Sequence, residues 1–147
     1  MTGTSKRHQS AGFRSLAHTA DVGFKLWGET VADIFIQGAQ SLYSLMTDRR
    51  RLRARQVQEV AVEAPDQEAL LVEWLNYLLY LYDTQGFLAR QIEIEEISPT
   101  RLHARLQGDT FDPRRHEVKT GVKAATYHQL ALRPTPAGWE GRVILDL

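Results

Sequence analysis

Three carboxylate groups near the ends of the sequence have the chemistry of a metal site. Asp21 precedes an alternating apolar pattern, and Asp146 lies in the closing segment that ends at Leu147. Strands that open and close a small domain can pair side by side, which would bring together Asp21, Asp146 and the α-carboxylate of Leu147. Like charges at short range repel each other unless a cation lies among them, and Ca²⁺, Mg²⁺ and Mn²⁺ prefer oxygen ligands. The two ends of the sequence therefore indicate an oxygen-lined site for a divalent cation.

The strand faces agree with such a site but leave a second interpretation open. Asp21 is out of phase with the apolar residues that follow it, and Asp146 shares a face with Arg142 and Ile144. Both acids therefore lie off the main apolar stripes, as a surface metal site requires. In the second interpretation Asp21 caps a turn with His18 and Asp146 is a solvated strand end, because exposed acids are common.

Other side chains could act beside the acids or contact a partner. His18 lies three residues before Asp21, and His128 is in phase with apolar residues of its predicted strand. His128 is therefore either a core histidine or a group for proton transfer or metal binding. Lys123 and Tyr127 are predicted on the opposite face of that strand, where they would present a charge and an aromatic ring to a partner or to solvent.

The composition predicts one soluble domain without thiol chemistry. A chain of 147 residues, 43% of them hydrophobic, is long enough to bury a core. Because the net charge is zero, any attraction to nucleic acid or membrane must come from a local patch. The absence of cysteine excludes disulfides and thiolate zinc sites and fits a cytoplasmic protein, and no apolar run is long enough to span a bilayer.

The hydrophobic periodicity predicts an α+β fold made of two strand–helix–strand–strand units, one inserted in the other. Helices are expected at residues 31–46 and 65–82, the first with a capping box formed by Thr30 and Asp33. Strands are expected at residues 22–27, 57–62, 87–97, 102–106, 122–132 and 139–147. Residues 57–106 complete one unit and the flanking segments form the other, so antiparallel sheets would pack on two main helices.

Several local details accompany this architecture. Residues 1–12 are predicted to be a flexible tail, followed by a domain at residues 13–147 with the inserted unit at about 57–106. Gly38 lies on the apolar face of its helix, which predicts close approach of another backbone. Residues 107–116 are predicted to form a polar loop.

Five arginines in residues 49–55 leave two functions open. They could contact tRNA phosphates, which would give salt-dependent and sequence-independent binding. They could equally form a solvated loop after the first helix, since arginine favours helix C-termini. The zero net charge and the lack of interleaved aromatic residues favour the loop.

Four segments, in this order and at this spacing, resemble the archease family. They are residues 18–23 (HTADVG), 70–79 (LLVEWLNYLL), 122–128 (VKAATYH) and 144–147 (ILDL), and the resemblance covers residues 16–147. The chain has Gly121 where the family often carries an acidic residue, so no function is assigned to that position.

The resemblance implies a non-enzymatic accessory protein of RNA ligation with the nested fold described above. By this resemblance the chain is similar to chaperone-like activators of RtcB-type ligases, which are GTP- and manganese-dependent and join tRNA halves in splicing. Such an activator promotes guanylylation and multiple turnover of the ligase, and its contact with tRNA could be indirect, through the ligase. The resemblance also implies that Asp21, Asp146 and a main-chain oxygen of Leu147 bind the metal, with Ca²⁺ expected in the isolated protein and Mn²⁺ or Mg²⁺ as alternatives.

Two other functions could use the same residues. A metal-dependent phosphoester hydrolase would use the carboxylates to activate water, although the sequence shows no second metal shell and no clear general base. A general RNA-binding chaperone would act through residues 49–55.

Overall fold

Two capped helices form the central layer of the computed structural model, which describes residues 10–16 and 21–147. Helix α2 (Val31–Met46) begins after Thr30, whose hydroxyl accepts a hydrogen bond from the Asp33 N–H at 3.1 Å. The Asp33 carboxylate accepts from the Thr30 N–H at 3.2 Å, so the predicted capping box is confirmed. Helix α3 (Gln67–Gln85) begins after Asp66 and ends at Gly86, whose φ of +69° is the left-handed conformation that glycine adopts readily.

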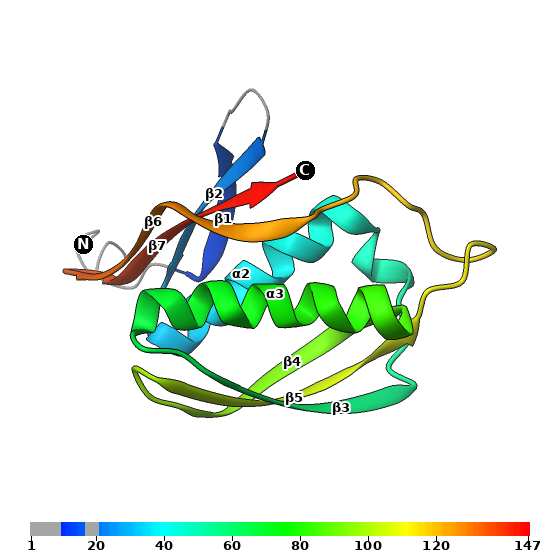
Figure 1. Cartoon of the computed structure of the whole chain (residues 1–147), viewed down its shortest axis with the longest axis horizontal. Coiled ribbons are helices and arrows are strands. Elements are labelled where there is room, and N and C mark those ends of the chain that lie inside the picture. The colour runs from blue at the N-terminus through cyan, green and yellow to red at the C-terminus, as the bar shows by residue number, and fades with distance from the viewer. Residues whose placement is uncertain (1–9, 17–20) are drawn as a thin grey trace, which may run out of the picture.

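Both helices contact both sheets, and this explains the broad apolar stripe of α3 (Figure 1). Its fully buried side chains are Leu70, Leu71, Val72, Trp74, Leu75 and Leu78. Trp74 also donates its indole N–H to the Phe35 carbonyl of α2 at 2.9 Å, so the polar atom of the largest core side chain is satisfied. None of the described helices combines the length and the apolar character needed to cross a membrane.

The two antiparallel sheets have the same internal order. The four-stranded sheet runs β1 (Gly12–Leu16), β2 (Asp21–Gly28), β7 (Gly138–Asp146), β6 (Ala124–Thr135). The three-stranded sheet runs β3 (Gln56–Glu63), β5 (Arg101–Thr110), β4 (Phe87–Ile97). In each unit the last strand lies between the other two, so the predicted α+β fold of two nested strand–helix–strand–strand units is confirmed.

Strand β1 is an addition that the sequence pattern did not predict. It pairs with β2 from Gly12 to Leu16, so the ladder includes the last residue of the predicted tail, and residues 1–9 lie outside the described chain. Phe13 packs edge-to-face on Phe24 with ring centroids 5.5 Å apart. The strand has only a weak alternation of its own, and its partner β2 supplies the ladder and the apolar contact that hold it.

The prediction of a polar loop at residues 107–116 is wrong for its first four residues, which extend β5 to Thr110. Gly108 shows why a polar segment is held in the sheet here. A Cβ at this position would lie 2.1 Å from the Leu88 carbonyl oxygen, so only glycine allows the approach of β4. Ladder hydrogen bonds come from the backbone and do not require apolar side chains.

A large bulge in β6 reverses the strand faces expected from the sequence. Thr126 lies opposite Ile144 and Ala131 lies opposite Arg142, so residues 127–130 of β6 face a single residue of β7. Gln129, within the bulge, has a φ of +53°. Because the excess of residues is odd, side chains before and after the bulge change faces. Ala125 is therefore buried, where simple alternation predicted an outward position.

The expectation that Gly38 contacts another backbone is also wrong. A Cβ at this position would meet the side chains of Leu71 and Leu75 at 3.4 and 3.5 Å, and these are ordinary van der Waals distances. The α2–α3 contact therefore has room for a methyl group at this position.

We expect Gly38→Ala to raise the free energy of unfolding by about 1 kcal/mol, because alanine has the higher helix propensity and fits without a clash. Gly108→Ala should lower it by about 2 kcal/mol, because the added Cβ would collide with the Leu88 carbonyl. Urea denaturation at constant slope measures both changes. A destabilised Gly38→Ala would mean that the helix contact is tighter than the distances above.

Candidate metal centre

Asp21 and Asp146 lie directly opposite each other at the end of the β2–β7 ladder. Directly opposite residues of an antiparallel pair project from the same face, with Cβ atoms about 4.5–5.5 Å apart. The two carboxylates are therefore brought together by register alone. The predicted pairing of the first alternating strand with the last strand is confirmed.

Two carboxylates of like charge face each other at this position. Asp146 is exposed and Asp21 is half-buried, and like charges directly opposite each other destabilise a sheet. Along the same face of the ladder come first Gly23 and Ile144 and then Lys25 and Arg142. Four strand residues span about 13 Å, so the cationic pair of this ladder lies well away from the acids. A divalent ion would offset the repulsion with the oxygen ligands that it prefers.

The main-chain oxygens at the end of β7 differ in availability. The Asp146 carbonyl accepts a hydrogen bond from the Lys123 N–H at 2.8 Å and is used by the sheet. The ladder ends at Asp146, and half-buried Leu147 follows it. The main-chain oxygen of Leu147 is therefore the first one after the ladder, one residue beyond Asp146. The residues present fit the predicted donor set of two aspartates and this oxygen.

The structure places the remaining predicted side chains around β6. Lys123 is exposed and lies beside Asp146 through its backbone hydrogen bond. Tyr127 and His128 lie in the β6 bulge and are both exposed, so the expectation that His128 lies on an apolar face is wrong. Its role as a partner or metal group stays a prediction. His18 lies outside the described residues.

Tyr127 turns toward α3 rather than away from it. Its hydroxyl donates to the Glu73 carboxylate at 3.2 Å. Desolvation, followed by the Glu73 charge, raises the pKa of Tyr127 above its ordinary value. One turn of α3 further along, the Asn76 amide bonds both the N–H and the carbonyl of Ala125, at 2.8 and 3.2 Å. Helix α3 therefore supplies hydrogen bonds to the edge strand that carries these residues.

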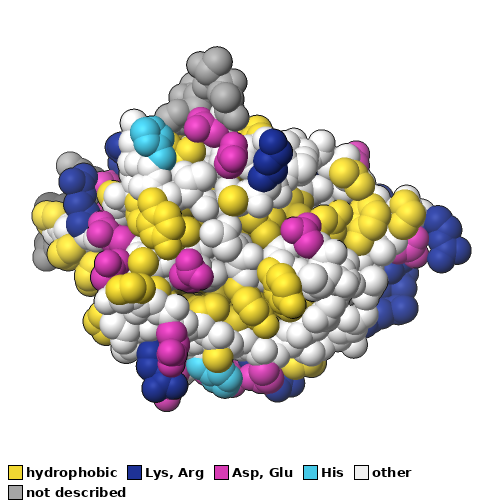
Figure 2. Space-filling model, viewed as in Figure 1, with side chains coloured by type: hydrophobic (Ala, Val, Ile, Leu, Met, Phe, Trp, Pro, Cys, Tyr) yellow, Lys and Arg dark blue, Asp and Glu magenta, His cyan; other side chains and the backbone are white. Residues whose placement is uncertain are grey.

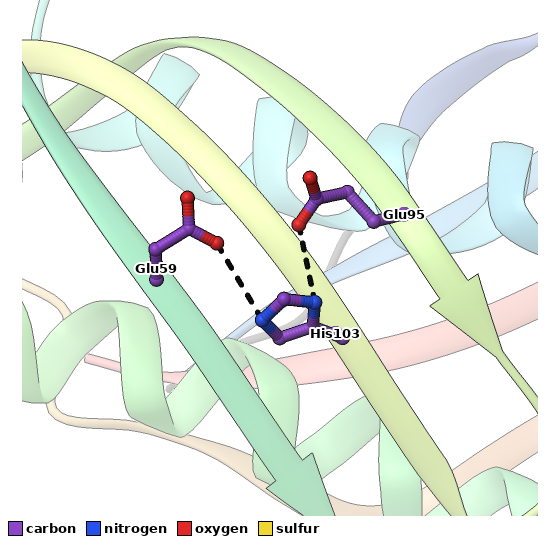
Figure 3. A group of neighbouring side chains, drawn as sticks. All are labelled: Glu59, Glu95 and His103. Carbon is purple, nitrogen blue, oxygen red and sulfur yellow. Dashed lines mark ion pairs between the residues drawn. The ribbon is translucent and has the colours of Figure 1, made fainter.

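A second group, missed from the sequence, lies on the outer face of the three-stranded sheet (Figure 3). Among the described residues, Glu59, Glu95 and His103 have ligand atoms close enough to hold a metal ion. Figure 3 shows the His103 ring between the two carboxylates, with Nε2 3.5 Å from Glu59 and Nδ1 3.1 Å from Glu95. The three residues come from three strands, so only the pairing of β3, β5 and β4 reveals them.

The same contacts also form a cluster of ion pairs that is stable without a metal ion. Both ring nitrogens of His103 already face carboxylates, and Arg105 contacts Glu59 at 3.2 Å. A metal ion would have to replace one of these contacts beside the Arg105 charge.

The arginine segment is anchored by a buried carboxylate. Residues Arg49–Arg51 form a 3-10 turn, η1, and the chain then runs extended into β3. Asp109, only 3% exposed, accepts from the N–H groups of Arg53 and Thr110 at 3.0 and 2.9 Å and contacts Arg115 at 3.3 Å. Burial alone would raise the pKa of Asp109, but the hydrogen bonds from Arg115 and Arg53 outweigh it and lower the pKa.

Comparison with known proteins connects this geometry to one family. The model of the Archease protein family (MTH1598/TM1083) matches residues 13–147. The chain is 34% identical over 143 residues to protein archease of Methanosarcina mazei, covering 95% of this chain and 98% of that protein. It is 37% identical over 135 residues to protein archease of Thermococcus gammatolerans, covering 88% and 94% of the two chains.

Two solved structures share the fold. The solution structure of Methanobacterium thermoautotrophicum protein 1598 superposes with a TM-score of 0.78 at 30% identity, covering 92% of this chain and 99% of that one. The crystal structure of a Thermotoga maritima archease, described as a possible chaperone, superposes with a TM-score of 0.66 at 18% identity, covering 91% and 96%. The second similarity supports the fold alone.

We expect Asp109→Asn to lower the free energy of unfolding by about 2 kcal/mol at pH 7, because it weakens a buried charge-assisted network. The folded-state pKa of Asp109 is depressed. The contribution of Asp109 to the free energy of unfolding is therefore fully present above its pKa in the unfolded state, about 3.9. It is lost as the pH falls through the lower pKa of the folded state. The difference in the free energy of unfolding between variant and parent, measured by urea denaturation, should shrink as the pH falls from about 5 to about 2. Asp83→Asn, at an exposed position of α3, is the control, and a gap independent of pH would contradict the assignment.

Proposed function

The chain belongs to the archease family, and on that premise we propose that it activates an RtcB-type RNA ligase without catalysing a covalent step itself. The ligase would be the GTP- and manganese-dependent enzyme of tRNA splicing or RNA repair in the cytoplasm. The activator would promote its guanylylation and its multiple turnover, in contact with tRNA through the ligase. The observation that carries the proposal in this chain is the register that sets Asp21 opposite Asp146.

In this proposal Asp21, Asp146 and the main-chain oxygen of Leu147 hold a divalent ion. When bound, the ion supplies positive charge that stabilises phosphoryl transfer, or it is delivered to the manganese-dependent ligase. The chain itself contributes rigidity, because both aspartates lie in a paired ladder whose other face is core. Asp146 is exposed at the end of its strand, so a partner surface can approach it.

We expect Ca²⁺ or Mn²⁺ to raise the melting temperature of the parent protein and to leave that of Asp146→Asn unchanged. Saturation at 100 times the Kd corresponds to about 2.7 kcal/mol of stabilisation and to a shift of about 5–10 °C for a domain of this size. Chelation with EDTA should reverse the shift in the parent. Thermal denaturation followed by circular dichroism measures all three results.

Glu95→Gln is the matched control for this measurement. It also neutralises one carboxylate, but in the Glu59–Glu95–His103 group. The metal-dependent shift should persist in this variant. If the metal instead raised the melting temperature of Asp146→Asn but not that of Glu95→Gln, the metal site would be the group on the outer face of the three-stranded sheet.

The ligase role has its own test in a multiple-turnover ligation assay with substoichiometric ligase, GTP and Mn²⁺. The parent and Glu95→Gln should stimulate product formation beyond one turnover, whereas Asp146→Asn should not. Full stimulation by Asp146→Asn would exclude a role for the metal. Ligation or phosphoester cleavage by the chain in the absence of ligase would contradict the non-enzymatic assignment.

A further inference from the structure

Positive charge is concentrated at one end of a chain whose net charge is zero. Residues 48–55 hold five arginines and one aspartate, residues 109–119 hold equal numbers of cations and acids, and Arg90 lies beside the first segment. We call residues 47–55, Arg90 and residues 109–119 the basic end, and it carries an excess of five positive charges. Figure 2 shows Lys and Arg side chains gathered at the right of the molecule, where Figure 1 places the segment between β5 and β6.

Several of these arginines are held by neutral acceptors. Arg49 donates to the Arg90 carbonyl at 3.1 Å, Arg90 to the Leu52 carbonyl at 2.7 Å, and Arg51 to the Arg115 carbonyl at 2.9 Å. Such hydrogen bonds fix the guanidinium groups without cancelling their charge. Fixed guanidinium groups lose less entropy when they bind an anion.

The side chains of two further arginines make fewer interactions than these. Arg53 and Arg55 are exposed, and their backbone N–H groups donate hydrogen bonds to Asp109 and to the Gly108 carbonyl. No hydrogen bond or ion pair of their side chains occurs within the part of the chain that the structure describes. Both guanidinium groups are therefore available to an external anion.

Three hollows follow one another across the basic end. The largest, about 540 Å³, is lined by Ser44, Thr47, Asp48, Arg49, Arg50, Glu117 and Lys119. It shares Arg49 and Arg50 with a hollow of about 370 Å³ that reaches Arg90. It shares Asp48 and Glu117 with one of about 270 Å³ that reaches Arg51 and residues 113–116. The arrangement suits an extended ligand with repeated charges.

The wall of the largest hollow contains an unpartnered hydroxyl. Thr47 is 2% exposed, and its Oγ1 makes no hydrogen bond within the described protein. The buried Nε of Arg49 in the same wall is also without an acceptor. A buried polar group without a partner costs free energy. Both groups can donate, but their atoms are buried in the wall, so the exposed guanidinium groups are the ones that an anion in the hollow would meet.

We propose that the basic end binds the phosphate backbone of a single RNA strand. Eight of its nine cations are arginines, whose planar forks match phosphate oxygens. No Phe, Tyr or Trp lines the three hollows, and the His116 ring in the wall of the third is buried, so contacts to phosphates rather than to bases would dominate and binding would be independent of sequence. The proposal stands on charge distribution and hollow geometry and does not depend on activation of a ligase.

Fluorescence anisotropy with the full chain and a labelled, unstructured 20-nucleotide RNA tests the proposal. The test variant replaces Arg50, Arg53 and Arg55 with Ala, and the control replaces Arg101, Arg133 and Arg142, which are also exposed and lie outside the basic end. The test variant should bind at least about tenfold more weakly, with a salt-dependence slope reduced by at least about 1.4, since Arg53 and Arg55 would each contribute about 0.7 on a single strand, whereas Arg50 is paired with Asp48 at 2.9 Å. The control variant should bind RNA like the parent.

Two results would overturn the proposal. The first is that the parent fails to bind RNA at 50 mM salt. The partner of the basic end would then be an acidic protein surface instead. The other is an equal loss of affinity in the test and control variants, which would show that net charge alone attracts the RNA. Asp146→Asn should bind RNA like the parent, so failure of the metal role and failure of RNA binding are distinguished.

Discussion

The antiparallel ladder between β2 and β7 is the constraint on which the structure depends. It joins the strand after the N-terminal segment to the last strand, from Asp21 opposite Asp146 to Gly28 opposite Trp139. One face of the ladder buries Phe24, Leu26 and Val143 against the helices, and the other face carries the acids. A slip of one residue would place the acids in the core, so burial of the apolar face enforces the register of the candidate metal centre.

The inserted unit is tied to the outer unit through α3. This helix belongs to the inserted unit, yet Asn76 and Glu73 contact Ala125 and Tyr127 of β6, at the edge of the outer sheet. An edge strand leaves backbone groups unpaired, and the Asn76 amide occupies one donor and one acceptor of that edge. The nested arrangement therefore does more than place two sheets next to each other. Helix α3 of the inserted unit also supports β6, the strand that begins beside Asp146.

The acidic centre and the basic end are linked by a short stretch of chain. The Lys119 N–H bonds the Met46 carbonyl at the end of α2, and the Lys123 N–H bonds the Asp146 carbonyl at the end of β7. Four residues span at most about 14 Å, so the two regions lie close together. An RNA phosphate at one and a divalent ion at the other would meet on neighbouring surfaces of the same molecule.

The sequence alone determined the helices, most of the strands, the nesting of the units and the pairing of Asp21 with Asp146. These follow from periodicity, from the Thr30 cap and from the position of each strand in the chain, all of which are local or topological signals. Only the tertiary structure decided the face of His128, the meeting of Glu59, Glu95 and His103, and the burial of Asp109 beneath the arginines. An odd bulge, a three-strand register and a buried ion network arise from contacts between distant segments, which leave no periodic trace in the sequence.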